Sequence, residues 1–140
     1  MSRFILTLLL GAALCGLAAR AQALDLTVEV RGARSDEGTV SAALYASAET
    51  WAAMKQPLRA QRVPAGARTL LVFRDLPAGT YALAVIHDQN GNGKLDTNPV
   101  GMPIEAYGFS RDARGNFGPP KFDDAAIAVS TDLTIKVALQ

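Results

Sequence analysis

The run LPAGTYALAVIHD, residues 76–88, carries the strongest indication of the fold. Within it, Tyr81, Leu83, Val85 and His87 share one side of a strand, because successive side chains of a strand point to opposite faces. The opposite side carries the small residues Ala82 and Ala84, and the run begins with a Pro-Ala-Gly turn. The pattern therefore predicts a central strand that contributes one face to a hydrophobic core.

Further strands are predicted on both sides of this run. Leu24–Arg31 alternates apolar and polar residues, and Leu133–Leu139 repeats the pattern near the end of the chain. The other strand candidates are Thr39–Tyr45, Arg59–Val63, Thr69–Arg74 and Ala125–Val129. A turn at Pro64, Ala65 and Gly66 predicts that the strands next to it, Arg59–Val63 and Thr69–Arg74, pair as a hairpin.

One short helix is expected at Ala48–Lys55, with Ser47 as its N-cap and Trp51 filling a place in the core. About seven short strands, this helix and one long Gly- and Asn-rich loop predict an all-β protein. The fold class is an antiparallel β-sandwich of immunoglobulin-like or transthyretin-like type.

The N-terminus predicts a secretory signal peptide over residues 1–23, from Arg3, the apolar run Phe4–Leu10 and the small residues Ala21 and Ala23. Residues 24–140 then form a single β-sandwich domain that is periplasmic or secreted. The apolar part of the leader is shorter than the ~20 residues that span a bilayer, so no membrane span is expected in the mature protein.

Charge and cysteine content narrow the function classes. The chain has 14 basic and 13 acidic residues, and loss of Arg3 and Arg20 leaves 12 − 13 = −1. Such a balance gives no reason to expect nucleic acid as a partner. The single cysteine, Cys15, would leave with the leader, so the mature domain is expected to hold together without disulfides.

The run DQNGNGKLD, residues 88–96, carries the most distinctive chemistry. Calcium takes about six to eight oxygen ligands, and acidic or amide side chains on alternate positions of a tight loop supply them. Gly93 stands where a calcium loop turns sharply. The candidate calcium ligands are Asp88, Asn90, Asn92, Lys94 through its backbone carbonyl, and Asp96.

The same run has a metal-free interpretation. Pro99 stands at the twelfth position in place of a bidentate Glu, which excludes an EF-hand, so a closing carboxylate would have to come from Glu105 or Asp112. Asn-Gly pairs are also strong tight-turn signals, and a turn needs no ion. A calcium site with few carboxylates is expected to be weak, with a dissociation constant of about 10⁻⁴ to 10⁻³ M.

A second candidate site follows this loop. Rings bury a large area at low entropic cost, so the aromatic residues here are typical of a stacking surface for a glycan or a protein segment. The alternative is that the rings only anchor the loop on the sandwich. The residues of this predicted ligand or partner surface are Tyr107, Phe109, Arg111, Arg114 and Phe117.

Catalysis is not expected. The mature chain has one histidine, no cysteine and no G-x-S-x-G motif. His87 is interpreted as a histidine at the end of a core strand. A hydrolase or lyase that uses His87 with Asp88 or Glu105 remains the enzymatic alternative.

The run Val85–Asp124, VIHDQNGNGKLDTNPVGMPIEAYGFSRDARGNFGPPKFDD, resembles the bacterial exported family known as domain of unknown function 2141. The likeness extends over roughly Leu26–Leu139. The resemblance implies a transthyretin-like or immunoglobulin-like sandwich and implies no known activity. It places the family's Asn-rich acidic loop at residues 88–96 and its Gly-Phe-Ser feature at residues 108–110.

These observations predict an exported, non-enzymatic β-sandwich module. Its calcium-binding loop is expected to order a loop that binds a ligand or partner. The alternative is a metal-free structural or assembly module of the cell envelope.

Overall fold

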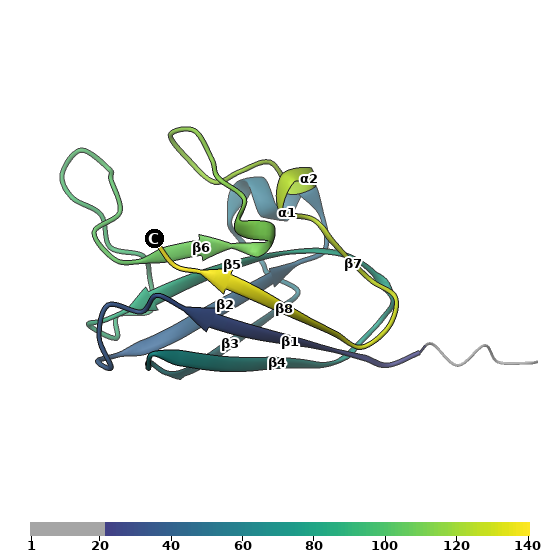
Figure 1. Ribbon diagram of the computed structural model, residues 1–140. Coiled ribbons are helices and arrows are strands. Elements are labelled where there is room, and N and C mark those ends of the chain that lie inside the picture. The colour runs from purple at the N-terminus through teal and green to yellow at the C-terminus, as the bar shows by residue number, and fades with distance from the viewer. Residues whose placement is uncertain (1–21) are drawn as a thin grey trace, which may run out of the picture.

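The computed structural model describes residues 22–140, so the predicted signal peptide lies almost wholly outside the described residues. Two sheets pack face to face as a sandwich, and two short helices lie beside them (Figure 1). The strands are β1 Leu24–Arg31, β2 Thr39–Tyr45, β3 Arg59–Pro64, β4 Arg68–Leu76, β5 Gly79–Asp88, β6 Tyr107–Phe109, β7 Ile127–Val129 and β8 Leu133–Ala138. The helices are α1 Ala48–Ala53, α2 Phe122–Ala125 and the 3-10 turn η1 Ser110–Asp112. The predicted β-sandwich class is confirmed, and a second short α-helix adds to the one expected.

The first sheet has three strands in the order β4-β1-β8, and the second has five. In the second sheet the order is β3-β2-β5-β6, and β7 pairs with the first part of the same edge of β5. Within residues 22–140, no helix is both long and apolar enough to cross a bilayer.

Two predictions about strand pairing are wrong. β1 and β8 are parallel, whereas a wholly antiparallel sandwich was expected. β3 pairs with β2 and β4 pairs with β1, so the turn after Pro64 carries the chain from one sheet to the other and forms no hairpin. Alternation of apolar residues marks the inner face of each strand, but it does not say which strands are neighbours.

The core lies between the two sheets. Leu26 and Phe73 from the three-stranded sheet meet Leu44 and Leu83 from the five-stranded sheet, and all four are almost fully buried. Burial of each such side chain contributes about 1.5–3 kcal/mol relative to exposure. The odd-numbered residues of β5 face this core, as their shared parity predicts.

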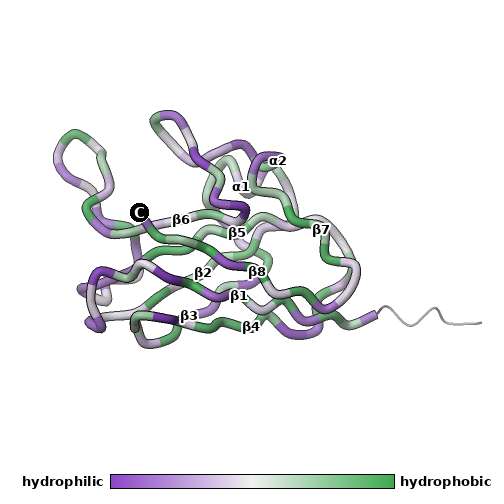
Figure 2. Tube along the Cα trace, in the orientation of Figure 1, coloured by the Kyte–Doolittle hydropathy of each residue, from purple (hydrophilic) through white to green (hydrophobic). Residues whose placement is uncertain are grey.

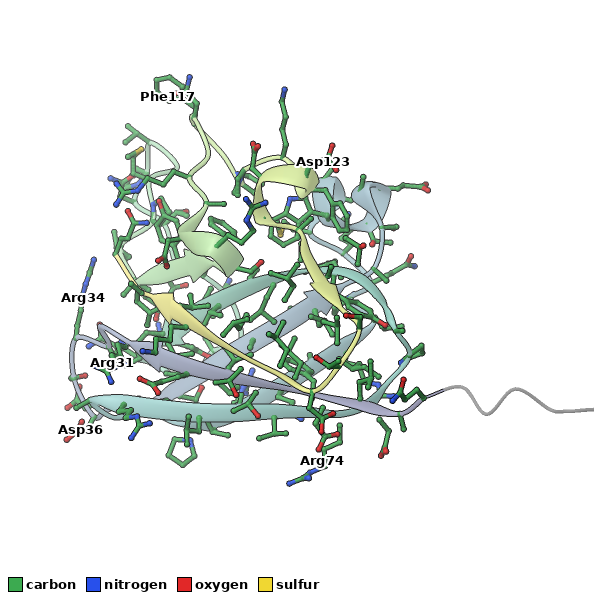
Figure 3. All side chains as sticks on the ribbon, turned by 45° about the vertical axis from the view of Figure 1, so that its right-hand side comes forward. Arg31, Arg34, Asp36, Arg74, Phe117 and Asp123 are labelled. Carbon is green, nitrogen blue, oxygen red and sulfur yellow. The ribbon has the colours of Figure 1, made fainter. Side chains whose placement is uncertain are left out.

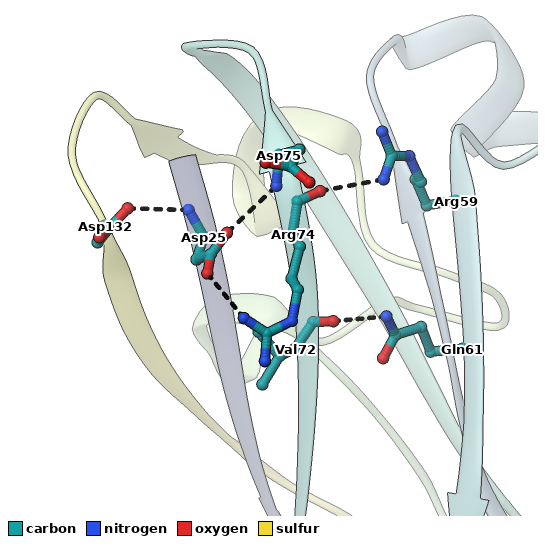
Figure 4. A network of polar contacts seen from close by, with 7 residues as sticks. All are labelled: Asp25, Arg59, Gln61, Val72, Arg74, Asp75 and Asp132. Atoms are coloured by element: carbon teal, nitrogen blue, oxygen red, sulfur yellow. Dashed lines mark hydrogen bonds and ion pairs between the residues drawn. The ribbon is translucent and has the colours of Figure 1, made fainter. Parts of the chain in front are cut away.

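Polar side chains close one lateral edge of the sandwich (Figure 4). Gln61 of β3 donates to the backbone carbonyl of Val72 in β4, and Arg59 donates to the carbonyl of Arg74. These bonds link the two sheets where β3 and β4 run side by side without pairing. Asp25 accepts from the Arg74 guanidinium, which fixes the start of β1 against β4.

A smaller cluster covers part of the outer face of the five-stranded sheet. Ser47 caps α1 as expected, and Trp51 is 1% exposed. The indole Nε1 donates to the Pro120 carbonyl at 2.7 Å, and the ring lies 5.5 Å from Tyr45 in an edge-to-face pair. The expectation that Trp51 fills a core position is confirmed. Helices α1 and α2 thus cover the sheet over Ala82.

Candidate functional site

His87 is a structural residue at the end of β5. Its ring is fully buried, Nδ1 accepts from the backbone N–H of Arg34 at 3.2 Å, and Nε2 lies 2.8 Å from the carbonyl of Glu37. These partners assign the proton to Nε2, which donates to that carbonyl. The imidazole therefore links the β1–β2 connection to β5, and the interpretation as a core-strand histidine is confirmed.

Asp88 is the buried centre of the following loop. One of its carboxylate oxygens accepts from the backbone N–H of Asn92 at 3.1 Å, and the other accepts from the N–H of Gly93 at 2.8 Å. The chain can wrap around this carboxylate because Gly91 and Gly93 take positive φ values, which glycine adopts without strain.

Asp96 receives two side-chain amides. The Nδ2 atoms of Asn92 and Asn90 donate to its two oxygens at 2.7 and 2.5 Å. These hydrogen bonds favour the charged form, so the Asn92 amide first and the Asn90 amide second lower the pKa of Asp96 below its ordinary value. Candidate ligands that lie four and six residues away in the chain are thereby brought together around one carboxylate.

Glu105 closes the loop at its base. It is 5% exposed, and its two carboxylate oxygens accept from the backbone N–H groups of Gln89 and Asp96, both at 3.0 Å. Of the two closing carboxylates considered, Glu105 is the one that folds back to the loop. Asp112 lies elsewhere and accepts from the N–H of Ala138.

The candidate ligands Asp88, Asn90, Asn92 and Asp96, with Glu105, carry carboxylate and amide oxygens, which is the chemistry of a hard cation. Among the described residues, no group of three or more His, Cys, Asp and Glu side chains is placed to hold a metal ion. The set therefore fits calcium only if amide and backbone oxygens complete the coordination. The side chain of Lys94 is exposed, and its backbone N–H donates to Oδ1 of Asn92 at 3.1 Å, while the predicted role of its carbonyl stays a prediction.

The rest of the β5–β6 connection forms a tight hairpin that projects from the sandwich (Figure 1). Thr97 and Pro103 form an isolated bridge, and Oδ1 of Asn98 accepts from the N–H groups of Val100 and Met102. The tip nonetheless exposes apolar side chains, with Val100 82% and Met102 57% accessible. Figure 2 shows this hydrophobic stretch at the end of the loop.

A groove of about 1050 Å³ lies on the outer face of the five-stranded sheet, beside these loops. Neighbouring strands leave space for its floor because they present small side chains there: Ala43 of β2 pairs in register with Ala84 of β5. The apolar residues that line the floor and walls include Ile86, Tyr107, Phe109, Val100, Met102 and Phe117. Helices α1 and α2 cover one part of this sheet face, and the groove occupies the part that they leave open.

The predicted ligand residues divide into two groups. Tyr107, Phe109 and Phe117 line the groove, and Phe117, fully exposed, points away from the body of the protein at the tip of the β6–β7 loop (Figure 3). Arg114 lines an adjoining hollow of about 140 Å³, and Arg111 donates to the backbone carbonyl of Asp123 outside both spaces.

Sequence reasoning missed the floor and one border of the groove. Ala43 and Ala84 are visible as alanines on the outer side of two strands, but only the register places them side by side. Arg62 of β3 lines the same groove, and its Nε donates to Ser41 at 3.2 Å. The alternation of β3 was the signal for Arg62, since residues 60 and 62 share the outer face with Ser41 and Ala43.

A family model described as "Uncharacterized protein conserved in bacteria (DUF2141)" matches residues 28–136, which span both sheets, the Asp88–Asp96 loop and the groove. No curated protein and no solved structure shows a significant match to the chain.

Proposed function

The chain belongs to the DUF2141 family of uncharacterized bacterial proteins, and we propose that it is an exported, non-enzymatic binding module in which the Asp88–Asp96 loop binds calcium. The bound ion would hold one wall of the groove on the five-stranded sheet in a binding-competent position. The ligand would be a partner protein, a glycan or a small molecule that fits this groove.

A single observation carries the calcium proposal: two amides and one carboxylate from a nine-residue loop meet at one point. The Nδ2 atoms of Asn90 and Asn92 face Asp96 and supply the positive partner of its charge. The oxygen and nitrogen of an amide exchange places by a half turn of the last side-chain torsion. Calcium between these groups would replace the N–H donors as the positive partner and would turn both amide oxygens inward.

The loop is connected directly to the groove. Gly93, Lys94 and Leu95 line the groove, while their neighbours Asn92 and Asp96 face the candidate ion site. A cation that fixes the side chains of Asn92 and Asp96 therefore also fixes the wall between them. Glu105 extends the effect, because it ties both ends of the loop to one buried carboxylate.

A weak calcium site is consistent with an exported protein. A predicted secretory leader precedes the domain, and calcium sites of extracellular modules commonly have dissociation constants of about 10⁻⁴ to 10⁻³ M. The non-enzymatic part of the proposal is supported by His87, because backbone groups occupy both ring nitrogens and leave none to transfer a proton.

A calcium titration followed by melting temperature tests this function. If calcium binds only the folded state, a concentration of about 100 times the dissociation constant adds ~2.7 kcal/mol to the free energy of unfolding. Asp96→Asn is expected to abolish the shift, and Asp88→Ala to abolish it or to weaken the fold. Asp123→Asn, an exposed carboxylate on α2, is the matched control and should retain the shift.

The proposal fails if millimolar calcium leaves the melting temperature of the wild type unchanged. Magnesium at the same concentration separates specific coordination from general screening of charge, because it demands a smaller and more regular set of ligands.

A metal-free structural or assembly module is the second candidate. Both oxygens of Asp88 and both oxygens of Glu105 already accept backbone N–H groups, so the loop closes without an ion. In that case crosslinking to an envelope partner would be independent of calcium and of chelator.

A further inference from the structure

The groove on the five-stranded sheet has a charge pattern that the calcium loop does not require. Two cationic side chains, Arg62 and Lys94, line it, and no carboxylate is among the described residues that do. Neither cation forms an ion pair within residues 22–140. Lys94 lies only two residues from the carboxylate of Asp96, which leaves Arg62 as the more available of the two.

Two contacts hold the side chain of Arg62 in place. Its Nε donates to Ser41 at 3.2 Å, and its terminal nitrogen packs so closely on Gly93 that a Cβ there would lie 3.2 Å away. The guanidinium therefore stands at the border between the sheet and the Asp88–Asp96 loop. A planar guanidinium with free N–H groups is the side chain best suited to grip a carboxylate.

The wall of the groove formed by the β6–β7 loop exposes an apolar ring on an unfavourable backbone conformation. Phe117 is 100% exposed and has a φ of +59°, a left-handed conformation that is unfavourable for a large residue. The tip can turn this way because Gly115 has no Cβ, which would collide with the carbonyl of Gly118. An exposed ring on a strained backbone beside a groove is explained if a ligand buries the ring.

From these features we propose that the groove binds a small amphipathic anion, an acyl or aromatic carboxylate. Its apolar body would lie on the floor formed by Ala43 and Ala84, between Phe117 and the Val100 tip, and its carboxylate would meet Arg62, with Lys94 nearby. A volume of about 1050 Å³ is at the upper end of the range for small-molecule sites, which fits an extended chain or several rings. This proposal rests on the proposed function in one respect: bound calcium would hold in place the wall of the groove that contains Lys94.

Two fluorescent probes of matched shape test the inference on the mature chain. 1-Anilinonaphthalene-8-sulfonate is an amphipathic anion, and N-phenyl-1-naphthylamine is its uncharged analogue. Both are expected to bind and brighten, and dodecanoate is expected to displace them at lower concentration than dodecanol does.

Variants then separate charge from shape. Arg62→Gln should lower affinity for the anionic probe about tenfold and leave the neutral probe unchanged, since it removes only the charge-assisted contact. Arg74→Gln, on the other sheet, is the matched control and should change neither. Ala84→Phe should weaken the binding of both probes, because the larger side chain fills the floor. Phe117→Ala should also weaken the binding of both, and because it removes a fully exposed ring it does not disturb the packing of the protein.

The results are distinguishable from those of the calcium experiment when each titration is run with calcium and with chelator. If calcium raises the melting temperature but neither probe binds, the groove proposal is overturned and the calcium site stands. If each probe binds with the same affinity in chelator as in calcium, the groove proposal is supported and the ordering role of calcium fails. Equal binding of both probes to wild type and Arg62→Gln would overturn the assignment of an anionic ligand.

Discussion

The two outer faces of the sandwich differ in what their strands present to solvent. On the three-stranded sheet, Glu29 is paired with Arg31 at 2.7 Å and with Arg68 at 2.8 Å, and these charged residues of β1 and β4 share the outer face with the half-exposed Leu70. On the five-stranded sheet, small and aromatic side chains stand where charges would be expected, and Ala43 and Ala84 form the floor of a groove.

This difference indicates that the outer face of the three-stranded sheet is the one suited to contact with solvent. A charged face with internal ion pairs needs no partner, whereas exposed apolar surface on a monomer marks a place of interaction. Elsewhere on the five-stranded sheet, the apolar surface near Ala82 is covered by α1, α2 and Trp51. The groove is therefore the part of this face that the fold leaves uncovered.

The sharpest test of the comparison uses adjacent residues of β5. Leu83 is fully buried between the sheets, and Ala84 lies on the groove side. Leu83→Ala is expected to cost about 2–5 kcal/mol of unfolding free energy, because it leaves a cavity in the core. Ala84→Ser should change stability by less than about 0.5 kcal/mol. Urea denaturation of both variants measures this, and equal losses would contradict the assignment of the two faces.

A second test addresses how the groove edge of β5 is held. β7 pairs with residues 79–81 and β6 with residues 84–86, which leaves the N–H of Leu83 between them. Ser110 fills the gap, because its Oγ accepts from Leu83 at 2.9 Å and donates to the carbonyl of Ala125.

Ser110→Ala is expected to cost about 1–3 kcal/mol, since it leaves a buried N–H without a partner. Ser130→Ala, at an exposed turn, is the control. Thermal denaturation distinguishes them, and a Ser110→Ala protein as stable as the control would show that the gap is closed in another way.

The smallest expected effect concerns the charged face. Hydrogen bonds from Arg68 and then Arg31 lower the pKa of Glu29 below its ordinary value of 4.5. A carboxyl whose pKa is lower in the folded state stabilises the fold above its unfolded pKa, and this contribution is lost as pH falls through the folded value.

The stability of Glu29→Gln should therefore depend less on pH than that of the wild type below about pH 4.5. Its stability should also depend less on salt, because the variant lacks the ion pairs that salt screens. Melting temperatures between pH 2 and pH 7 measure this. A wild type and variant with parallel pH profiles would show that the two arginines do not act on Glu29 in solution.

Much of the fold follows from the sequence, and the remainder depends on long-range pairing. The parity of Leu83 and His87 predicted the inner face of β5, and Ser47 and Trp51 predicted the covering helix. The parallel pairing of β1 with β8 was not predictable, because alternation is the same whichever direction a neighbouring strand runs.

The candidate site shows the same division. Spacing alone brought Asp88, Asn90, Asn92 and Asp96 into one candidate loop, since all lie within nine residues. Glu105 could be named only as one of two possibilities, because its side chain folds back from outside the run 88–96. Arg62 was missed, because the pairing of β3 with β2 brings it beside Gly93. Residues that are local in sequence were predictable, and residues that meet through register were not.

Backbone amide spectra recorded by NMR during a calcium titration test whether the Asp88–Asp96 loop binds the ion and orders the wall of the groove. We expect the amides of Asn92, Gly93 and Lys94 to show the largest saturable shifts, the amides of Leu95 and Tyr107 at the groove to shift with the same midpoint, and Asp96→Asn to abolish both changes. Spectra that stay unchanged, or that shift only at exposed carboxylates such as Asp123 and Asp124, would contradict this expectation.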